Sequence, residues 1–281
     1  EKPGRIARID FDTGEVLSRF DSFTLPLSLV REEGGVLYCL ERNGSIRKIE
    51  TSGMRTSYEY PAWGIHTMVP MGNRYILAGK SRTGVFSSPL VSINAGTGET
   101  VSVDAPPAFL VFALEHDPGK NRIYYAGLAN EADGTTVTKL YSADLDRPGN
   151  AAGIAVAASA DIDADIHVDS ATSDLYTTLG NTLRKWDGSR WTNFEAANGL
   201  PVFIRDRGTL LFTINADGSV SAWDKKSGRP AGTLFLLDDG NWIAVAPDGT
   251  FLASHGPGEG IPLTAQRNGI LLSDEEFSGL R

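Results

Sequence analysis

The sequence predicts an all-β fold built from repeated four-stranded antiparallel sheets, the blades of a single β-propeller domain over residues 1–281. Three observations support this prediction. A short alternating strand that ends in a turn recurs along the chain, pairs of apolar runs lie between its copies, and helical periodicity is nearly absent. Together they favour six blades, with seven blades as the alternative.

The recurring strand has six copies, spaced by roughly 35 to 50 residues. Each copy alternates apolar and polar side chains and closes on a polar or glycine turn, which is the pattern of a half-buried strand followed by a turn. The copies span residues 5–14, 44–53, 89–98, 138–149, 181–189 and 218–228.

Paired apolar runs lie between these copies, at residues 28–40, 67–78, 112–127, 166–179, 202–214 and 242–254. Turn-forming residues join the two runs of each pair, among them Gly34-Gly35, Gly208 and Gly249. Glycine supplies the positive φ that tight hairpins require, so each pair predicts a β-hairpin.

Helical patterning is confined to one short candidate turn at residues 274–277. Strands of about five residues, separated by turn signals, are typical of an all-β sandwich, barrel or propeller. A repeat length near 40 residues favours the propeller, whose blade is a four-stranded antiparallel sheet.

The two ends of the chain predict how the ring closes. The chain opens on a third-strand copy and a fourth-strand candidate at residues 16–20, and it nearly ends on a first pair at residues 242–254. Joining these strands would complete a sixth, composite blade and remove the open sheet edges. Residues 261–272 could instead form two further strands, which would imply a seventh blade or a chain that is part of a longer protein.

Composition narrows the classes of function. Lys and Arg number 26 against 35 Asp and Glu, so the formal net charge is −9, which argues against a nucleic-acid partner. No apolar run reaches the roughly 18 to 20 residues of a membrane-spanning helix. The single Cys39 excludes an internal disulfide and a cysteine-cluster metal site.

The start of the chain bears on its location. It begins at Glu1 with no charged-then-apolar leader, which we interpret as the removal of a signal segment. We therefore expect a periplasmic or extracellular protein, although a trimmed cytoplasmic domain would look the same.

Residues 218–228, GSVSAWDKKSG, resemble the repeat of WD-repeat and quinoprotein-like propellers, in which an aromatic residue and an aspartate end the third strand before a glycine turn. Residues 9–15 look like the same element, and residues 241–254 look like the final repeat of bacterial WD-type propellers. The resemblance covers nearly the whole chain. It implies that Trp223 and Asp224 pack and hold turns and do not catalyse a reaction.

A second resemblance covers one blade. Residues 183–201, LRKWDGSRWTNFEAANGLP, look like one repeat of the two-component-regulator sensor propellers. That family occurs in the periplasmic sensing portions of bacterial proteins, so the resemblance implies a sensory module outside the cytoplasm.

The most unusual segment reads DIDADIHVD. In an extended strand, alternation would put Asp161, Asp163, Asp165 and Asp169 on one face together with His167. Carboxylate oxygens suit calcium, so the four aspartates are candidate metal ligands. Carboxylates at i and i+2 lie about 6 to 7 Å apart, however, which is loose for one ion. The alternatives are a solvent-facing strand with its leading loop, and an acidic recognition patch.

The four histidines, His66, His116, His167 and His255, fall in separate predicted blades. Neither a Gly-x-Ser-x-Gly elbow nor a His-Glu-x-x-His helix accompanies them. We therefore assign no catalytic and no cofactor-binding residue.

These observations predict a non-enzymatic propeller scaffold that binds a protein partner or a small ligand, as a sensory or extracytoplasmic interaction module. The alternative is a metal-dependent, lactonase-like hydrolase with calcium in the central channel. A third alternative, a quinone-dependent oxidoreductase, lacks its vicinal cysteine pair because Cys39 stands alone. The oligomeric state stays open.

Overall fold

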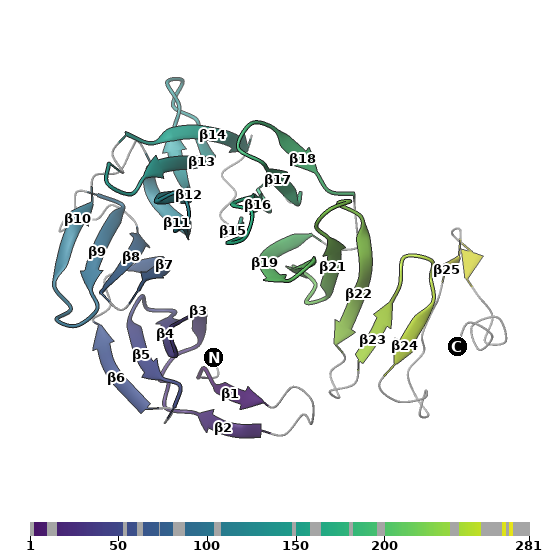
Figure 1. Cartoon of the computed structure of the whole chain (residues 1–281), viewed down its shortest axis with the longest axis horizontal. Helices are drawn as coiled ribbons and strands as arrows, with labels where there is room; N and C mark the ends of the chain where they lie inside the picture. The colour runs from purple at the N-terminus through teal and green to yellow at the C-terminus, as the bar shows by residue number, and fades with distance from the viewer. Residues whose placement is uncertain are drawn as a thin grey trace. The chain divides into compact units, whose positions relative to one another are not determined.

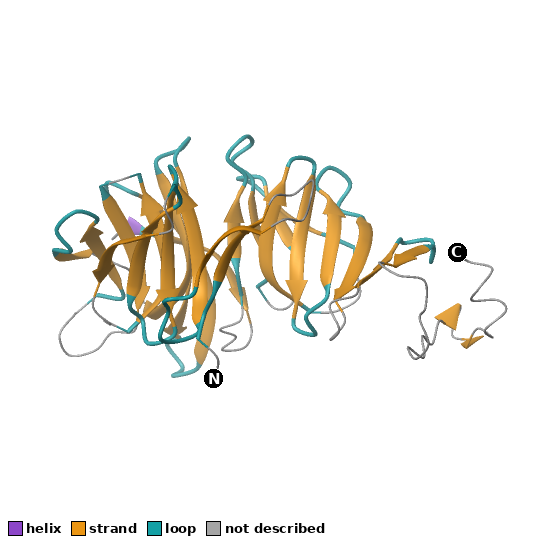
Figure 2. Cartoon of the chain, turned by 90° about the horizontal axis from the view of Figure 1, so that it is seen from below, coloured by secondary structure: helices purple, strands orange, loops and turns teal. Residues whose placement is uncertain are grey.

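The structure, a computed structural model, is β-rich throughout the part of the chain that it describes (Figure 2). The described residues are 3–9, 16–52, 55–60, 64–72, 74–80, 88–103, 108–147, 150–157, 164–179, 182–195, 200–236, 242–253, 266–267 and 270–271. None of their helical segments is long and apolar enough to cross a membrane.

The chain divides into two compact units, residues 1–162 and residues 163–281. Unit 1 opens with two antiparallel strands, β1 (Ile6–Ile9) and β2 (Val16–Phe20), which pair with each other. The single domain expected over the whole chain remains a prediction.

Three four-stranded antiparallel sheets complete unit 1, each made of strands that are consecutive in sequence (Figure 1). They are β3 (Leu27–Glu33), β4 (Val36–Glu41), β5 (Ile46–Glu50) and β6 (Arg55–Tyr60); β7 (Ile65–Met71), β8 (Tyr75–Lys80), β9 (Leu90–Asn94) and β10 (Thr100–Val103); and β11 (Ala108–Asp117), β12 (Arg122–Asn130), β13 (Thr136–Asp144) and β14 (Ala152–Ala157). Strand β7 packs against β3 and also against β11, so the sheets stack in sequence order.

Unit 2 contains a four-stranded sheet, a six-stranded sheet and one short pair. They are β15 (Ile166–Val168), β16 (Leu175–Thr177), β17 (Arg184–Trp186) and β18 (Trp191–Asn193); β19 (Pro201–Arg207), β20 (Leu210–Asn215), β21 (Val220–Asp224), β22 (Pro230–Leu236), β23 (Trp242–Val245) and β24 (Phe251–Ala253); and β25 (Gln266–Arg267) with β26 (Ile270–Leu271). Strand β15 packs against β19, so these two sheets also stack.

The predicted repeat is confirmed in both units. Five copies of the recurring strand form β5, β9, β13, β17 and β21, each the third strand of its sheet, and the sixth copy forms β1. Every predicted apolar pair forms an antiparallel hairpin, from β3–β4 to β23–β24. Consecutive antiparallel sheets stacked in this way are the blades of a β-propeller, so the predicted fold class is confirmed at this level.

The predicted number of blades is wrong. The described residues form five sheets of four or more strands, not six or seven. The sequence predicts that β23 and β24 join β1 and β2 in a composite blade, but β23 pairs with β22 and widens the fifth sheet. A short connection favours this pairing of adjacent strands, because closing a short loop costs little chain entropy.

The other expected features of the C-terminal part differ too. In place of two blade strands over residues 261–272, β25 and β26 span two residues each and pair only with each other. The helical turn predicted at residues 274–277 lies outside the described residues.

A common turn chemistry shapes the hairpin tips. In the β20–β21 hairpin, Asp217 Oδ1 accepts the backbone N–H of Ser219 at 3.0 Å and its hydroxyl at 2.7 Å, while Gly218 between them takes a φ of +83°. The side chain thus replaces a backbone turn bond. The same bonds join Asp133 to Thr135, Asp187 to Ser189, Asp248 to Thr250 and Asn43 to Ser45.

The core of unit 1 covers both faces of the β7–β10 sheet. On β8, every residue from Ile76 to Lys80 is buried. Ile76 packs in a cluster with residues of the β3–β6 sheet, whereas the next residue, Leu77, packs in a cluster with Val111 and Tyr125 of the β11–β14 sheet. Strand β8 is therefore apolar on both faces because a neighbouring sheet covers each face.

Candidate functional site

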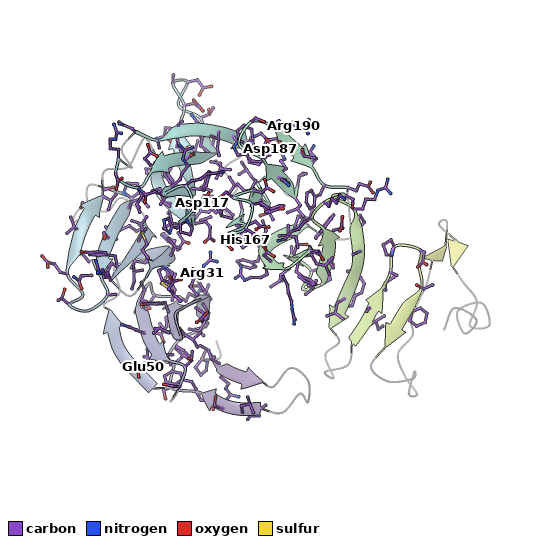
Figure 3. The ribbon with its side chains drawn as sticks, viewed as in Figure 1. Arg31, Glu50, Asp117, His167, Asp187 and Arg190 are labelled. Atoms are coloured by element: carbon purple, nitrogen blue, oxygen red, sulfur yellow. The ribbon has the colours of Figure 1, made fainter. Side chains whose placement is uncertain are left out.

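The structure describes only part of the predicted acidic site. Asp161 and Asp163 lie outside the described residues. Asp165 and Asp169 flank β15, and His167 is its central residue, labelled in Figure 3. The extended segment is therefore short, and its two ends contact different parts of unit 2.

Asp165 joins β15 to β19. Its Oδ2 accepts the backbone N–H of Ile204 at 3.0 Å and lies 3.5 Å from Arg205 Nη1, while its Oδ1 accepts the backbone N–H of Ile166 at 2.9 Å. Both oxygens are thus occupied by donors of the protein itself, and the carboxylate fastens one sheet to the next.

Asp169 belongs to a second contact between the same sheets, which we call the Lys225 cluster: Lys225, Asp169, Asp206 and His167. Lys225 Nζ lies 2.7 Å from Asp169 Oδ2 and 2.5 Å from Asp206 Oδ2, and its side chain is only 12% exposed. His167 Nε2 lies 3.4 Å from the same Asp206 oxygen. One ammonium therefore holds two carboxylates that come from different sheets.

Electrostatics favours the charged forms of Asp169 and Lys225. Burial alone raises the pKa of Asp169, but hydrogen bonds from Lys225 and from the backbone N–H groups of Ala171 and Thr172 outweigh it and hold this pKa below its usual value. Burial lowers the pKa of Lys225, and the two carboxylates outweigh it in turn, so this pKa lies above its usual value. A lysine that stays protonated is a poor nucleophile, so the cluster acts as an ionic joint between sheets.

The described histidines lie on three different strands. His66 lies on β7, His116 on β11 and His167 on β15, and His255 falls outside the described residues. Burial is the main cause that lowers the pKa of His116, against the opposing charges of Asp117 and Glu33. Within the described ranges, no group of three or more His, Cys, Asp or Glu side chains could hold a metal ion. The calcium site therefore remains a prediction.

Unit 1 has its own buried ion pair. Arg31 on β3, labelled in Figure 3, lies 3.1 Å from Glu115 on β11, and both side chains are less than one-fifth exposed. The pair connects the first and third four-stranded sheets of this unit, which both pack against the second, whereas the Lys225 cluster joins two sheets that are direct neighbours.

A different surface stands out on the β19–β24 sheet. Along β20, buried and more exposed residues alternate: Leu211, Thr213 and Asn215 are buried, whereas Phe212 and Ile214 are not. The buried side meets the β15–β18 sheet, where Leu211 packs in a cluster with Tyr176 and Phe194. The other side is therefore the one that this neighbouring sheet leaves uncovered.

A row of apolar residues crosses that uncovered side, which also carries Arg205 and Arg207 at its β19 end. Strand register puts Phe203, Ile214, Val220, Leu234 and Ala244 in one row across five strands, because directly paired residues share a face. Phe203 is 41% exposed and Ile214 is 39% exposed. We call this surface the apolar face; it comprises Phe203, Phe212, Ile214, Val220, Leu234 and Ala244.

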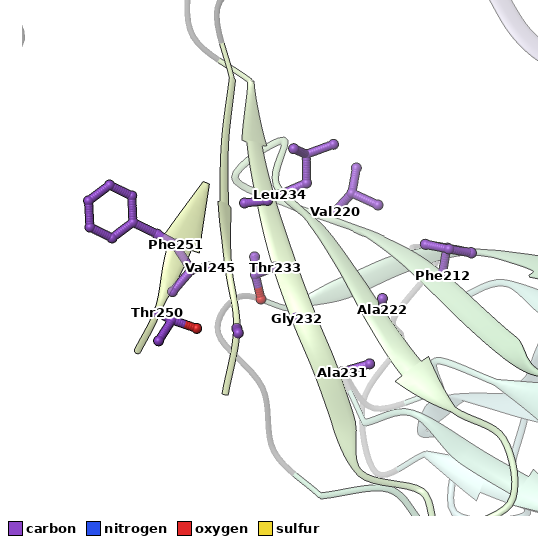
Figure 4. A pocket seen from close by; sticks show the side chains of 12 residues that line it. Phe212, Val220, Ala222, Ala231, Gly232, Thr233, Leu234, Val245, Thr250 and Phe251 are labelled. Carbon is purple, nitrogen blue, oxygen red and sulfur yellow. The ribbon is translucent and has the colours of Figure 1, made fainter. Parts of the chain in front are cut away.

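The same sheet has a hollow of about 670 Å³ at its β20–β24 part (Figure 4). Phe212, Val220 and Leu234 line it from three neighbouring strands, and Val245 and Phe251 line it from β23 and β24. A hollow with so few polar groups suits hydrophobic side chains better than a charged substrate.

Sequence reasoning missed this face and the role of Lys225. The signal for the face is present, because Phe203-Ile204 and Leu210-Leu211-Phe212 are consecutive apolar residues, as expected of a strand that is apolar on both sides. Lys225 gives no such signal, since Asp169 lies 56 positions away in the chain.

Comparisons with known proteins give the fold and no family. No family model matches the chain, and no curated protein matches it. A chain from the crystal structure of a nidogen/laminin complex matches with a TM-score of 0.61 and 13% identity, over 83% of this chain and 90% of that one. The computationally designed protein Ika8 matches with a TM-score of 0.56 and 14% identity, over 90% of each chain. At such identities the likeness is one of fold alone, and the WD-repeat and quinoprotein-like character stays a resemblance of sequence pattern.

Proposed function

We propose that this chain is a non-enzymatic propeller scaffold that binds a protein partner through the apolar face of unit 2. The observation that carries the proposal is the pair Phe203 and Ile214, which are about two-fifths exposed and continue a row of apolar residues across the sheet. Contiguous apolar patches on soluble proteins commonly mark interaction sites, because leaving such a surface in water costs free energy.

The charged groups of unit 2 support binding over catalysis. The two described aspartates of the predicted metal site are held by Arg205, Lys225 and backbone donors. Their role in the proposal is to fix one sheet on the other, so that the apolar face is presented on a rigid support.

The wider setting is part of the same proposal. One structure of similar fold was solved as a nidogen/laminin complex, which is compatible with a propeller that serves as a binding platform. We propose a sensory or interaction role outside the cytoplasm, for which the support is the resemblance of residues 183–201 to sensor propellers.

Site-specific photo-crosslinking tests the proposal. A benzophenone amino acid placed at Phe203 should give one discrete adduct upon irradiation of cells that make the protein, and Ile214→Glu in the same chain should reduce its yield at least tenfold. The matched control is the same amino acid at Lys226, which is exposed on the β21–β22 turn of the same unit. Equal adduct patterns from positions 203 and 226 would rule out the apolar face as the binding surface.

A further inference from the structure

Two tyrosines in the core of unit 1 are buried together with their hydroxyl groups. Tyr125 on β12 is 0% exposed, and Tyr141 on β13 is 3% exposed. Among the residues that the structure describes, neither hydroxyl oxygen has a hydrogen-bond partner. Burying a hydroxyl in this way costs free energy, because its bonds to water are lost and not replaced. In folded proteins, buried polar groups of this kind are commonly bonded to an internal water molecule.

The two side chains form a pair. Tyr125 and Tyr141 are directly opposite each other on the neighbouring strands β12 and β13 (Figure 1), and their rings stack with centroids 5.1 Å apart and planes inclined by 21°. Their core cluster is otherwise aliphatic, with Val111, Leu114 and Ile123 among its members. The two tyrosines therefore supply the only hydroxyl groups of this cluster.

We propose that Tyr125 and Tyr141 form a binding site for one internal water molecule, which bridges their hydroxyl groups. Two O–H···O bonds of about 2.8 Å let one water span up to about 5.5 Å between two oxygen atoms. The ring spacing of 5.1 Å is of this size. The inference concerns the core of unit 1 and is independent of the binding role proposed for unit 2.

Both tyrosines are suited to bind water as neutral phenols. Burial is the main cause that raises the pKa of Tyr125, and burial together with the charge of Glu131 raises the pKa of Tyr141 to about 12. A neutral phenol can both donate and accept a hydrogen bond. One water can therefore accept a bond from one tyrosine and donate a bond to the other.

Strand register leaves space beside the pair. Directly paired residues share a face of the sheet, so Leu114, Tyr125, Tyr141 and Gly153 form one row across β11 to β14. Gly153 lies next to Tyr141, and a Cβ at this position would meet nothing within 4 Å. The row therefore ends on a bulky side chain at Leu114 and on open space at Gly153.

Tyr38 provides the contrast within the same unit. It is 0% exposed, and its hydroxyl also has no hydrogen-bond partner in the described part of the chain. Its core cluster, however, consists of aliphatic residues and Met68 and contains no second hydroxyl. A buried water needs two or more polar partners, so the inference assigns no water to Tyr38.

Thermal unfolding of the full chain tests the inference. Tyr125→Phe and Tyr141→Phe should each lower the melting temperature by about 2 to 4 °C, because the remaining hydroxyl loses the water that it shared. The double variant should melt within about 1 °C of the unmodified chain, since it leaves no buried hydroxyl in the cluster. The matched control is Tyr38→Phe, which should melt at or above the unmodified chain.

A high-resolution crystal structure of the full chain supplies the direct observation. It should show a water oxygen within about 3 Å of both tyrosine Oη atoms. The inference is overturned if the two hydroxyls bond directly to each other, or if both single variants melt at or above the unmodified chain. Losses that add up in the double variant would also contradict it, as would a Tyr38→Phe variant that is destabilised as much as Tyr125→Phe.

Discussion

At the scale of single residues, the Lys225 cluster shows how a propeller sheet is fixed to its neighbour. Removing carboxylates from water is costly, and a partly buried ammonium compensates two of them at once. The cluster therefore predicts a strong effect of losing one side chain. Such an effect is not expected for an exposed lysine beside it.

Lys225→Met should lower the free energy of unfolding by about 2 to 3 kcal/mol, because Asp169 and Asp206 would lose their counter-charge while remaining largely buried. Lys226→Met, one position later and exposed, should change it by less than about 0.5 kcal/mol. Urea unfolding of both variants measures this difference. Equal unfolding midpoints for the two variants would contradict the assigned role.

Acid should act on the same cluster. The folded pKa of Asp169 lies below its usual value, so its contribution is present above about pH 4 and is lost as the pH falls through the folded pKa.

The residue scale is also where the sequence was least informative. Alternation predicted one extended segment from Asp161 to Asp169 with a shared ion, but β15 spans only Ile166–Val168, so Asp165 and Asp169 lie beyond its ends. Their partners, Arg205, Asp206 and Lys225, lie in the next sheet. These groups come within 4 Å of each other only because two sheets stack. The alternation of residues within one strand does not indicate which sheet will pack against it.

At the scale of elements, the contrast between β8 and β20 separates a strand covered on both sides from one covered on one side. Both are rich in apolar residues, but β8 is buried from Ile76 to Lys80, whereas burial alternates along β20. The covered strand leaves no room for added atoms, because protein interiors are close-packed.

Gly79→Ala on β8 should destabilise the protein by about 1 to 3 kcal/mol, as overpacking does. A Cβ at this position would lie 2.6 Å from Val111 Cγ1 and 2.7 Å from Thr67 Cγ2. Gly153→Ala on β14 is the control, since a Cβ there meets nothing within 4 Å. Thermal unfolding of the two variants should differ clearly, and a Gly79→Ala variant as stable as Gly153→Ala would refute the close approach of β8 and β11.

Strands and hairpins were the features that the sequence predicted most accurately. Hairpins follow from local turn chemistry, which is why each apolar pair and each third strand could be read from Gly, Asn and Asp positions. The pairing of β23 with β22 could not be read in this way. The backbone groups at the edge of a strand can pair with any strand that lies beside it. The sequence of the strand itself does not specify which strand that is.

At the scale of the whole molecule, the proposals differ in what calcium should do. An ion that binds only the native protein raises the apparent stability of that protein in proportion to ln(1 + [L]/Kd), where [L] is the free ion concentration and Kd is the dissociation constant. Asp165 and Asp169 already satisfy their oxygens with protein donors, so they have little capacity left for an ion.

We therefore expect the melting temperature to be the same, within about 1 °C, in calcium and in a chelator. Differential scanning calorimetry with 5 mM of each additive, beside a sample with neither, is the measurement. A calcium-dependent rise of several degrees would restore the metal-dependent hydrolase and direct attention to Asp161 and Asp163.

The hairpin tips have a consequence for the chemical durability of the chain. Asp-Gly dipeptides cyclise readily to a succinimide and then to isoaspartate, and four of them form described hairpin tips, at Asp133, Asp187, Asp217 and Asp248. At each of these tips, hydrogen bonds from the Ser or Thr two residues later hold the pKa of the aspartate below its usual value. The carboxylate thus stays ionised, which makes it a poor electrophile, and its oxygen is held by those donors. Folding thereby protects these four Asp-Gly bonds, which would isomerise more readily in the unfolded chain.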